Sequence, residues 1–474
     1  MADDDAARQS GAHSEVLTGW GRTAPTRAQV WEPTRTSDVL RLVEESARKR
    51  GDDARGIVAR GLGRSYGDAA QNRGGDVVRC TQLDRILDLD SDKGTCTVEA
   101  GVSIEMLMRV FLPLGWFPLV VPGTRHVTVG GAIASDIHGK FRHGSFADAV
   151  TRFGLATPER GLIALEPHQD AFWATAGGMG LTGIVTDATL QLQPVETAYM
   201  VVDTERATDV DDCMERMLSG DDRYRYSVAW IDCIAGGKNL GRSVLTRGNH
   251  ATLDDMPAKK RAAARAFEPR ELVRTPRWTP NGLLNSLSVR AFNELWFRKA
   301  PRERRDQIQS ITGFFHPLDG VLDWNRIYGS RGFVQYQFVV PYGEEAVVRT
   351  VLERLSAQRC ASFLAVLKRF EHESHGPLGF PTPGWTLALD VPAPDFQLAD
   401  LLDDLDRLVV EAGGRVYLTK DSRVRPELLS AMYPRLEHWR EVRATLDPNH
   451  ALCSDMDRRL DLTGAHAARS GSHN

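Results

Sequence analysis

The polar side chains best placed to do chemistry stand at the end of a glycine-containing stretch. This stretch covers residues 120–140, is rich in β-branched residues, and ends in Asp136, His138 and Lys140. An acid, a base and a cation so close together can move protons and hold a charged group. An apolar core needs neither this combination nor glycines, which let a backbone approach another group closely. The stretch therefore indicates a bound group that carries phosphate and a planar ring, although a satisfied buried histidine explains His138 equally well.

A second glycine group, residues 61–67, follows a predicted strand at residues 57–60. Its backbone amides can converge on a pyrophosphate, and Arg64 and Ser65 add a charge and a hydrogen-bond donor. The third glycine comes one residue later than in G-x-G-x-x-G, and a turn follows rather than a helix, which argues against a Rossmann site. Alone, the motif fits a structural turn nearly as well.

Further glycine groups favour the pyrophosphate-binding loop over the structural turn. Gly123 and the pair Gly130–Gly131 lie about 60 residues downstream, separated from each other by a predicted short strand, and residues 177–183 hold a third group. Several close-approach backbones, each beside a strand, are typical of a site for a long dinucleotide. The glycine groups therefore predict one dinucleotide-binding domain.

The elements expected to carry these loops have a β-α-β rhythm. A helix at 39–49 is expected to be capped by Ser37–Asp38, and a helix at 104–110 by Ser103. Strands are predicted at 57–60, 77–78, 95–98 and 189–193, a short helix begins at Asp170, and Pro194 marks a boundary. Beyond it, strands at 227–231 and 334–340 and a helix at 344–358 indicate an antiparallel sheet with helices.

The predicted fold class is therefore α+β with two domains. The first domain is expected to combine residues 15–194 with 415–463, and the second to cover 195–414. Polar ends at 1–14 and 464–474 are predicted to be disordered. Residues 258–305 are basic and are expected to be irregular, either as a solvated loop or as a mobile lid that meets anionic headgroups.

Composition limits the function classes. The 474 residues are 42% hydrophobic and 26% charged, with a net charge of −4, which is ordinary for a globular protein and gives no sign of nucleic-acid binding. The six cysteines form no C-x-x-C pair, so neither a disulfide framework nor a metal site is expected. The acidic start is unlike a signal peptide, and no apolar run is long enough to span a bilayer, so we expect a cytoplasmic location.

The chain also resembles a known family. Residues 60–68, 122–125, 127–133 and 136–140 are similar to the FAD-binding domain of the vanillyl-alcohol-oxidase superfamily, and matching blocks continue through Trp230, 316–319, 383–385 and 419–423. Within it, the chain most resembles oxidases of polyprenyl-phosphoryl ribose. The resemblance implies a two-domain fold of this superfamily, FAD held without a covalent bond because Arg64 occupies the position of a tethering histidine, and a short-chain NAD(P)H reductase as partner. It also implies peripheral contact with the inner face of the plasma membrane.

The resemblance assigns roles residue by residue. Lys420 and His138 would be catalytic. The residues expected to bind FAD are Arg60, Gly61, Leu62, Gly63, Arg64, Ser65, Tyr66, Gly67, Asp68, Gly123, Thr124, Thr128, Val129, Gly130, Gly131, Ser135, Asp136, Ile137, His138, Val185 and Tyr417. Those expected to bind substrate are Lys140, Trp230, Phe315, Gln337, Lys368 and Thr386.

Two roles are open for Lys420. A desolvated lysine can lose its proton and act as a base, or it can stay charged and hold an alkoxide or a phosphate. Without the resemblance, a salt bridge to Asp421 or Asp455 would be the favoured explanation, and Trp230 could equally be a core residue.

Three substitutions on the substrate side depart from the family pattern. Thr386 and Ala388 replace an asparagine and a cysteine, and Phe315 replaces a tyrosine. The missing thiol predicts insensitivity to inhibitors that bond to it. The changes leave three functions open: oxidation of the 2′-hydroxyl of a polyprenyl-phosphoryl ribose, oxidation of a soluble sugar alcohol or aldonolactone with oxygen as acceptor, or non-catalytic binding to a reductase.

Overall fold

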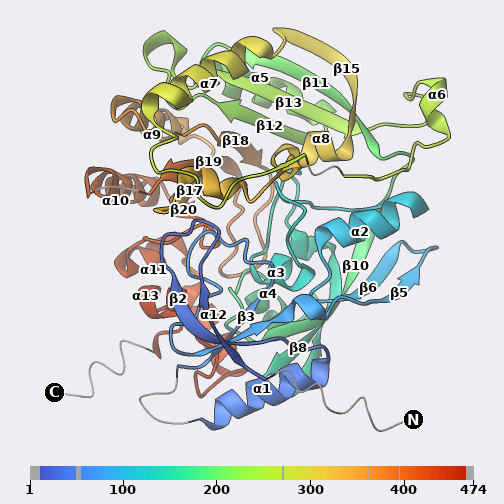
Figure 1. Cartoon of the computed structure of the whole chain (residues 1–474), viewed down its shortest axis with the longest axis vertical. Helices are drawn as coiled ribbons and strands as arrows, with labels where there is room; N and C mark the ends of the chain where they lie inside the picture. The colour runs from blue at the N-terminus through green and yellow to red at the C-terminus, as the bar shows by residue number, and fades with distance from the viewer. Residues whose placement is uncertain (1–10, 50–54, 270–271, 361, 394–395, 466–474) are drawn as a thin grey trace.

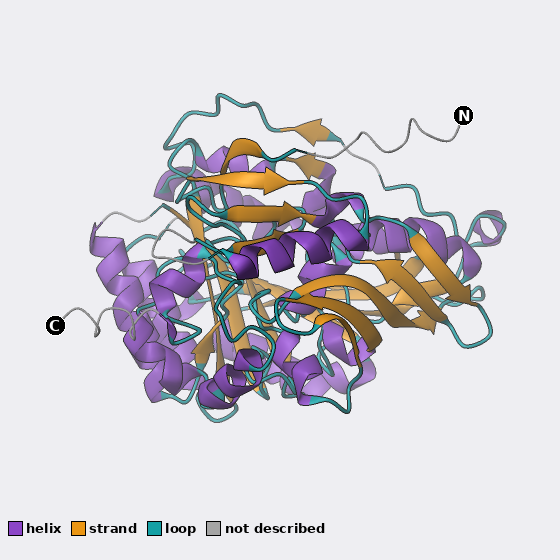
Figure 2. Ribbon diagram, turned by 90° about the horizontal axis from the view of Figure 1, so that it is seen from below, coloured by secondary structure: helices purple, strands orange, loops and turns teal. Residues whose placement is uncertain are grey.

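The computed structural model describes residues 11–49, 55–269, 272–360, 362–393 and 396–465. The eight-stranded sheet with helices α5, α7, α9 and α10 makes up the upper half in Figure 1, and two smaller sheets lie in the lower half. Figure 2 shows helices packed around these strands from a second direction. The predicted α+β, two-domain architecture is confirmed.

The lower half contains a four-stranded and a six-stranded sheet. The first has the order β1-β2-β4-β3, from β1 (His13–Leu17), β2 (Thr26–Trp31), β3 (Ile57–Arg60) and β4 (Asp76–Arg79). The second has the order β5-β6-β10-β8-β9, with β7 also paired to β10. Its strands are β5 (Ile86–Asp90), β6 (Thr95–Glu99), β7 (Trp116–Pro118), β8 (Val150–Thr157), β9 (Gly161–Leu165) and β10 (Ile184–Pro194).

Short helices connect and cover these sheets. They are α1 (Thr36–Arg48), α2 (Ile104–Phe111), α3 (Val129–Ala134) and α4 (Asp170–Thr175), joined by α11 (Leu429–Met432), α12 (Leu436–Ala444) and α13 (Asp455–Leu460) from the end of the chain. The C-terminal helices lie beside the N-terminal strands in Figure 1, and Arg459 on α13 forms an ion pair of 2.8 Å with Asp68. The two ends of the chain therefore build one region together.

The eight-stranded sheet is antiparallel, in the order β15-β11-β13-β12-β18-β19-β17-β20. Its strands are β11 (Tyr199–Ala207), β12 (Tyr226–Ile231), β13 (Ser243–His250), β15 (Glu303–Ser310), β17 (Phe333–Pro341), β18 (Ala365–Phe370), β19 (Gly384–Pro392) and β20 (Arg415–Val416). Because strand side chains alternate, Ala229 and Leu387 pack with the helical core while Trp230 and Ala388 point to the opposite face. This opposite face looks toward the lower half.

The remaining helices complete the upper half. They are α5 (Val210–Gly220), α6 (Ala258–Arg261), α7 (Ser286–Lys299), α8 (Ile311–Phe315), α9 (Glu345–Ala357) and α10 (Phe396–Glu411), and a small parallel pair joins β14 (Val273–Arg274) to β16 (Val321–Leu322). Side chains of α5, α9 and α10 pack in one core with the sheet, for example Met214, Val348 and Leu402.

Several local predictions are wrong. The short strand expected between the glycine groups at 123 and 130 is not formed, because Thr128 instead caps α3 through its hydroxyl, which accepts a hydrogen bond of 3.3 Å from the Gly131 amide. The cap of α1 is Arg35, with no side-chain hydrogen bond, rather than Ser37–Asp38. The segment 258–305 is not irregular, since it holds α7 and the start of β15.

The ends of the predicted domains are only partly visible. His13 and Ser14, expected to be disordered, belong to β1, whereas residues 1–10 and 466–474 lie outside the described part. Strand β10 ends at Pro194, and Arg415–Val416 still pair with β17 in the eight-stranded sheet. The domain boundaries stay a prediction.

Candidate active site

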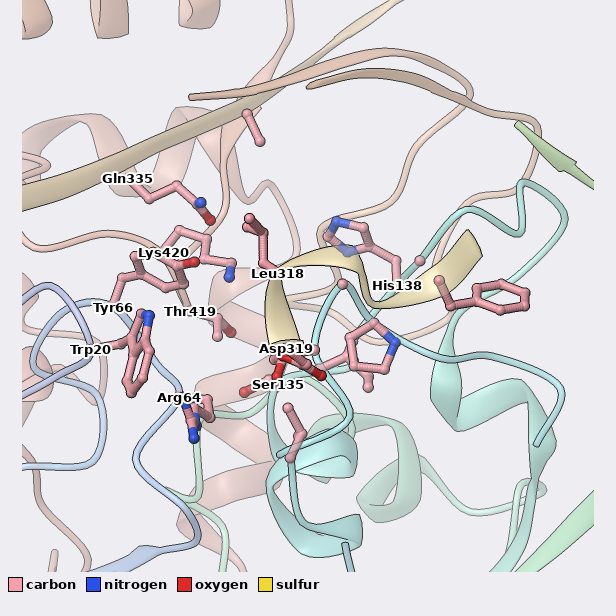
Figure 3. A pocket seen from close by; sticks show the side chains of 18 of the residues that line it. Trp20, Arg64, Tyr66, Ser135, His138, Leu318, Asp319, Gln335, Thr419 and Lys420 are labelled. Carbon is pink, nitrogen blue, oxygen red and sulfur yellow. The ribbon is translucent and has the colours of Figure 1, made fainter. Parts of the chain in front are cut away.

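A cavity of about 860 Å³ lies between the open face of the eight-stranded sheet and the glycine loops of the lower half. Strands β12, β17, β18 and β19 line one side of it, and residues 59–66 and 122–140 line the other. Figure 3 shows Lys420, Gln335, Tyr66 and His138 converging on it. The cavity is large for a ligand site, since such sites usually measure about 300–1,000 Å³.

The first glycine loop leaves β3 and runs along the cavity. The guanidinium of Arg60 donates hydrogen bonds to the carbonyls of Thr18 (2.7 Å) and Ala70 (3.0 Å), which fixes the start of the loop. A Cβ atom on Gly61 would lie 2.2 Å from the Thr128 hydroxyl. The two glycine groups, predicted separately from sequence, therefore meet at this point, and only glycine lets them do so.

Two polar groups beside these loops lack protein partners within the described part of the chain. The Nε atom of Arg64 and the Nδ1 atom of His138 are buried without a hydrogen bond. The Arg64 guanidinium stacks at 3.8 Å over the ring of Trp20. Buried donors are normally satisfied, so a ligand with phosphate and ring heteroatoms along this wall would fit them.

Three lysines with lowered pKa values face the cavity. Burial and the charge of Lys368 lower the pKa of Lys140 to about 7, and burial lowers that of Lys368 to about 8. Their ammonium groups donate to backbone carbonyls, Lys140 to Phe314 and Lys368 to Gly139. Carbonyls do not neutralise the charge, so these cations suit an anionic ligand.

Lys420 is the third lysine, and its ammonium lies 3.9 Å from the centroid of the Tyr66 ring. Burial, opposed by the charge of Asp390 and reinforced by that of Lys368, lowers its pKa to about 7. The salt bridges considered from sequence are not formed, because Asp421 pairs with Arg459 at 2.9 Å and Asp455 with Arg458 at 2.7 Å. A lysine poised near neutrality can exchange a proton with a ligand.

His138 lies in an aromatic enclosure beside these cations. The rings of Phe370, Phe380 and Tyr417 lie within 5.2 Å of its ring centroid. Burial, Lys368 and Lys420 hold the pKa of His138 well below its usual value. The Gln337 amide donates to its Nε2 at 2.8 Å, so the neutral ring carries its proton on Nδ1.

Most of the predicted site residues line this cavity. They are Arg60, Gly61, Leu62, Gly63, Arg64, Ser65, Tyr66, Gly123, Thr124, Thr128, Gly130, Gly131, Ser135, Ile137, His138, Lys140, Val185, Trp230, Phe315, Gln337, Lys368, Tyr417 and Lys420. The roles assigned to them stay predictions.

Five predicted residues lie behind the cavity wall. Gly67 packs against the Asp421 carbonyl, Asp68 pairs with Arg459, and Val129 is core. Asp136 accepts hydrogen bonds from the Ser374 hydroxyl (2.6 Å) and the Ala147 amide (3.2 Å). Thr386 is buried under Gln337, whose amide donates to its hydroxyl at 3.3 Å.

The most informative residue missed from sequence is Asp390. It is fully buried, accepts a hydrogen bond from Gln335 at 2.5 Å, and burial raises its pKa to about 7. The alternation that carries Thr386 and Ala388 to the cavity face puts Asp390 on this face too, which was a usable signal. Trp20, Asp319 and Gln335 also line the cavity and were missed.

A separate cluster could hold a metal ion, although no metal site was predicted. Ligand atoms of Asp148, His372 and His375 lie within 4.8 Å of one another, outside the cavity lining. The six cysteines are buried and free, and no described helix is long and apolar enough to cross a membrane.

Comparisons with known proteins agree with this geometry. Residues 28–166 match the model of an FAD binding domain. The chain is 43% identical over 452 residues to decaprenylphosphoryl-beta-D-ribose oxidase from Mycolicibacterium smegmatis, covering 94% of this chain and 97% of that protein. It is 41% identical over 372 residues to an uncharacterized protein in the mprA 5′ region of Streptomyces coelicolor, covering 76% of this chain and all of that protein. Similarity to a Streptomyces alditol oxidase is 27% over 38% of this chain and 43% of that protein.

Proposed function

Because the chain belongs to the family of decaprenylphosphoryl-beta-D-ribose oxidase, we propose that it is an FAD-dependent oxidase of a polyprenyl-phosphoryl ribose. The proposed reaction converts the ribose 2′-hydroxyl to a ketone. The observation that carries the proposal is the 43% identity, because it extends over both walls of the cavity and not over the FAD domain alone.

FAD is the cofactor, as the matched domain indicates. We propose that the loop 61–66 and the segment 123–138 hold it, since these segments line one wall of the cavity. In addition, the buried Nε atom of Arg64 donates no hydrogen bond to the described protein and can donate one to the cofactor. When bound, FAD supplies a hydride acceptor. No histidine stands at position 64, which supports non-covalent binding.

The chain's own groups supply the proton chemistry. A secondary alcohol that becomes a ketone loses a hydride from carbon and a proton from oxygen. We assign the proton to the Lys420 amine, whose lowered pKa lets it accept one near neutrality. Neutral His138, held by Gln337, offers the Nδ1 proton as a hydrogen-bond donor that positions the substrate oxygen or the cofactor ring.

The other two lysines suit the substrate's phosphate. Lys140 and Lys368 face the same cavity, and since neither has an acidic partner among the described residues, their charges favour a bound anion. In the proposed pathway a short-chain NAD(P)H reductase returns a hydride to the opposite face of the ketone, which gives the arabinose epimer. The proposed location is the inner face of the plasma membrane, because the lipid tail of the substrate resides there.

The test is product analysis with the FAD-loaded protein. After incubation with polyprenyl-phosphoryl ribose and an artificial electron acceptor, mass spectrometry should find a product lighter by two hydrogens, which borohydride returns to ribose and arabinose forms. An unchanged lipid would reject this substrate.

A second candidate is oxidation of a soluble polyol. It is favoured by Ala388, which lines the cavity, by Thr386, which lies behind the wall under Gln337, and by the partial similarity to alditol oxidase. Rapid peroxide formation from soluble polyols would support it, and a strict need for a lipid-linked substrate would exclude it.

A further inference from the structure

Exposed apolar side chains concentrate in one segment of the chain. Of the nineteen exposed large hydrophobic residues among those the structure describes, eight lie between residues 272 and 296. They are Leu272, Val273, Trp278, Leu283, Leu287, Phe292, Leu295 and Trp296. Trp278 is 81% exposed and Leu287 is 74% exposed. An apolar group of this density on a folded surface marks an interaction site.

The same segment is basic. Residues 272–296 contain three arginines and one acid, Glu294, a net charge of +2 in a chain whose total is −4, and Arg298, Lys299 and Arg302 follow directly. Glu294 is itself paired with Arg242 at 2.6 Å. Basic residues interleaved with exposed tryptophan and leucine are typical of surfaces that rest on anionic lipid headgroups.

Helix α7 has a second, inward side that reaches the cavity. Phe292 and Trp296 stack with their ring centroids 6.0 Å apart and line the cavity together with Val228 and Val244 of the sheet. The Asn293 amide donates a hydrogen bond of 2.8 Å to Asp232, and the Arg242 guanidinium lies 4.7 Å from the Phe297 ring centroid, which hold the helix over the sheet. Figure 1 shows α7 lying across the upper half.

The arm of the cavity beneath α7 combines apolar and polar side chains. Phe292 and Trp296 of the helix and Val228, Val244 and Val366 of the sheet line it, together with Thr204, Thr246, Gln307, Gln309 and Lys299. Lys140 and Lys368 line the same cavity. A cavity that joins these two cations to apolar strand and helix residues can take a ligand whose phosphate stands between a sugar and a long hydrocarbon tail.

We propose that the cavity arm beneath α7 holds the polyprenyl tail, and that the outer surface formed by residues 272–296 docks on an anionic membrane, from which the tail enters. We call this surface the α7 surface. This proposal rests on the proposed function, because the polyprenyl tail is part of the substrate proposed there. A membrane is favoured over a protein partner because the surface combines its apolar residues with a net positive charge and only one acid.

The experiment uses the full-length, FAD-loaded protein and vesicles of phosphatidylcholine, with or without about 30% phosphatidylglycerol. The protein should sediment with the anionic vesicles and be released by 0.5 M salt, which is about the concentration that screens surface charge within a few ångströms. The variant Trp278→Glu/Leu287→Glu should bind at least about tenfold more weakly, since two buried apolar contacts become two charges. Neither residue lines the cavity.

The matched control is Leu87→Glu/Leu162→Glu. These two leucines are 49% and 48% exposed and lie on β5 and β9, away from the α7 surface, so their replacement should leave vesicle binding unchanged. For the α7-surface variant, turnover of long-chain substrate in vesicles should fall about tenfold, while turnover of a short-chain, water-soluble analogue stays at the parent value.

Three outcomes would overturn the docking proposal: the parent does not bind anionic vesicles, the α7-surface variant binds as well as the parent, or the control variant loses binding equally. Binding of a purified reductase that the α7-surface variant abolishes, without vesicle binding by the parent, would make this surface a protein interface instead. Turnover of the short-chain analogue separates these results from failure of the proposed function, because it does not need a membrane.

Discussion

Lys420 places its ammonium 3.9 Å from the centre of the Tyr66 ring, with no carboxylate among the described residues in ion-pair contact with it. The ring stabilises the charged form, whereas burial and Lys368 favour the neutral form, and the resulting pKa is about 7. Both protonation states are therefore accessible at physiological pH, which a proton-accepting group requires.

Replacing Lys420 should remove catalysis but keep the cofactor. In Lys420→Ala the proton acceptor is lost, so kcat should fall by about 100-fold or more, as for loss of a general base. The FAD absorbance per protein should stay at the parent value, because the glycine loops are unchanged. Stopped-flow reduction by substrate would measure this. Full activity of the variant would mean that Lys420 does no chemistry.

The reduction rate should depend on the protonation of Lys420. Because the neutral amine accepts the proton, the rate should rise about tenfold per pH unit below pH 7 and level off above it. Asp390 raises the pKa of Lys420, so Asp390→Asn should shift the rising part of the pH–rate profile to lower pH. A rate that falls above pH 7 would instead make Lys420 a charged anchor for the alkoxide or the phosphate.

The buried lysines should make the substrate-free protein less stable at neutral pH than at alkaline pH. The ordinary lysine pKa is 10.5, and folding lowers that of Lys368 to about 8, so between these values the unfolded chain binds more protons. Stability therefore rises with pH across this window. Lys368→Met should raise the Tm at pH 7 by about 2 °C, and the gain should shrink near pH 10.

Thermal unfolding at both pH values measures this effect. Lys238→Met, at an exposed lysine, is the control and should change the Tm at neither pH. A lower Tm for Lys368→Met at pH 7 would show that Lys368 is stabilised by its surroundings rather than strained.

The contact between the two glycine groups should be essential for FAD binding. In Gly61→Ala the new Cβ would lie 2.2 Å from the Thr128 hydroxyl, which is fixed because it caps α3. One of the two loops must then move, and the ratio of flavin to protein absorbance should fall at least about fivefold. From half saturation this fall corresponds to a Kd about ninefold higher, or about 1.3 kcal/mol of binding free energy. Gly11→Ala, whose Cβ meets nothing within 4 Å, is the control. A Gly61→Ala variant as yellow as the parent would contradict the proposed cofactor position.

Introducing a thiol at Ala388 should make the cavity chemically reactive. Ala388 lines the cavity, so Ala388→Cys should be alkylated by a small maleimide, and bound substrate should slow this reaction. The parent should react slowly, because its cysteines are buried and burial raises the pKa of Cys80, the one that also lines the cavity, to about 12. Equal labelling of parent and variant would show that position 388 is closed to ligands.

Local sequence signals predicted the features that depend on neighbouring residues. The loop after β3 was predicted as a binding loop because glycines indicate a backbone that approaches another group closely. Gly61 does contact Thr128 in this way. Ser103 was correctly predicted to cap α2, where its hydroxyl accepts from the Met106 amide at 3.1 Å. The same signal at Thr128 was overlooked, because Val127 and Val129 suggested a strand.

Features that depend on distant segments were harder to predict. Asp390 becomes a partner of Gln335 only when β17 and β19 pair, and its raised pKa follows from burial that sequence does not reveal. Helix α7 was missed because Leu287 and Leu295 face outward, so its apolar residues do not form the single buried stripe that marks a helix in sequence. Roles that came from the family resemblance, such as that of Lys420, had no local signal at all.

The most direct test of the central claim is an anaerobic titration of the FAD-loaded protein, followed by its visible spectrum. Polyprenyl-phosphoryl ribose should bleach the flavin absorbance stoichiometrically, and the 2′-deoxyribose analogue should bind without bleaching, because it lacks the hydroxyl to be oxidised. A flavin that stays oxidised with the ribose substrate, or is bleached equally by the 2′-deoxy analogue, would contradict oxidation at the 2′-hydroxyl.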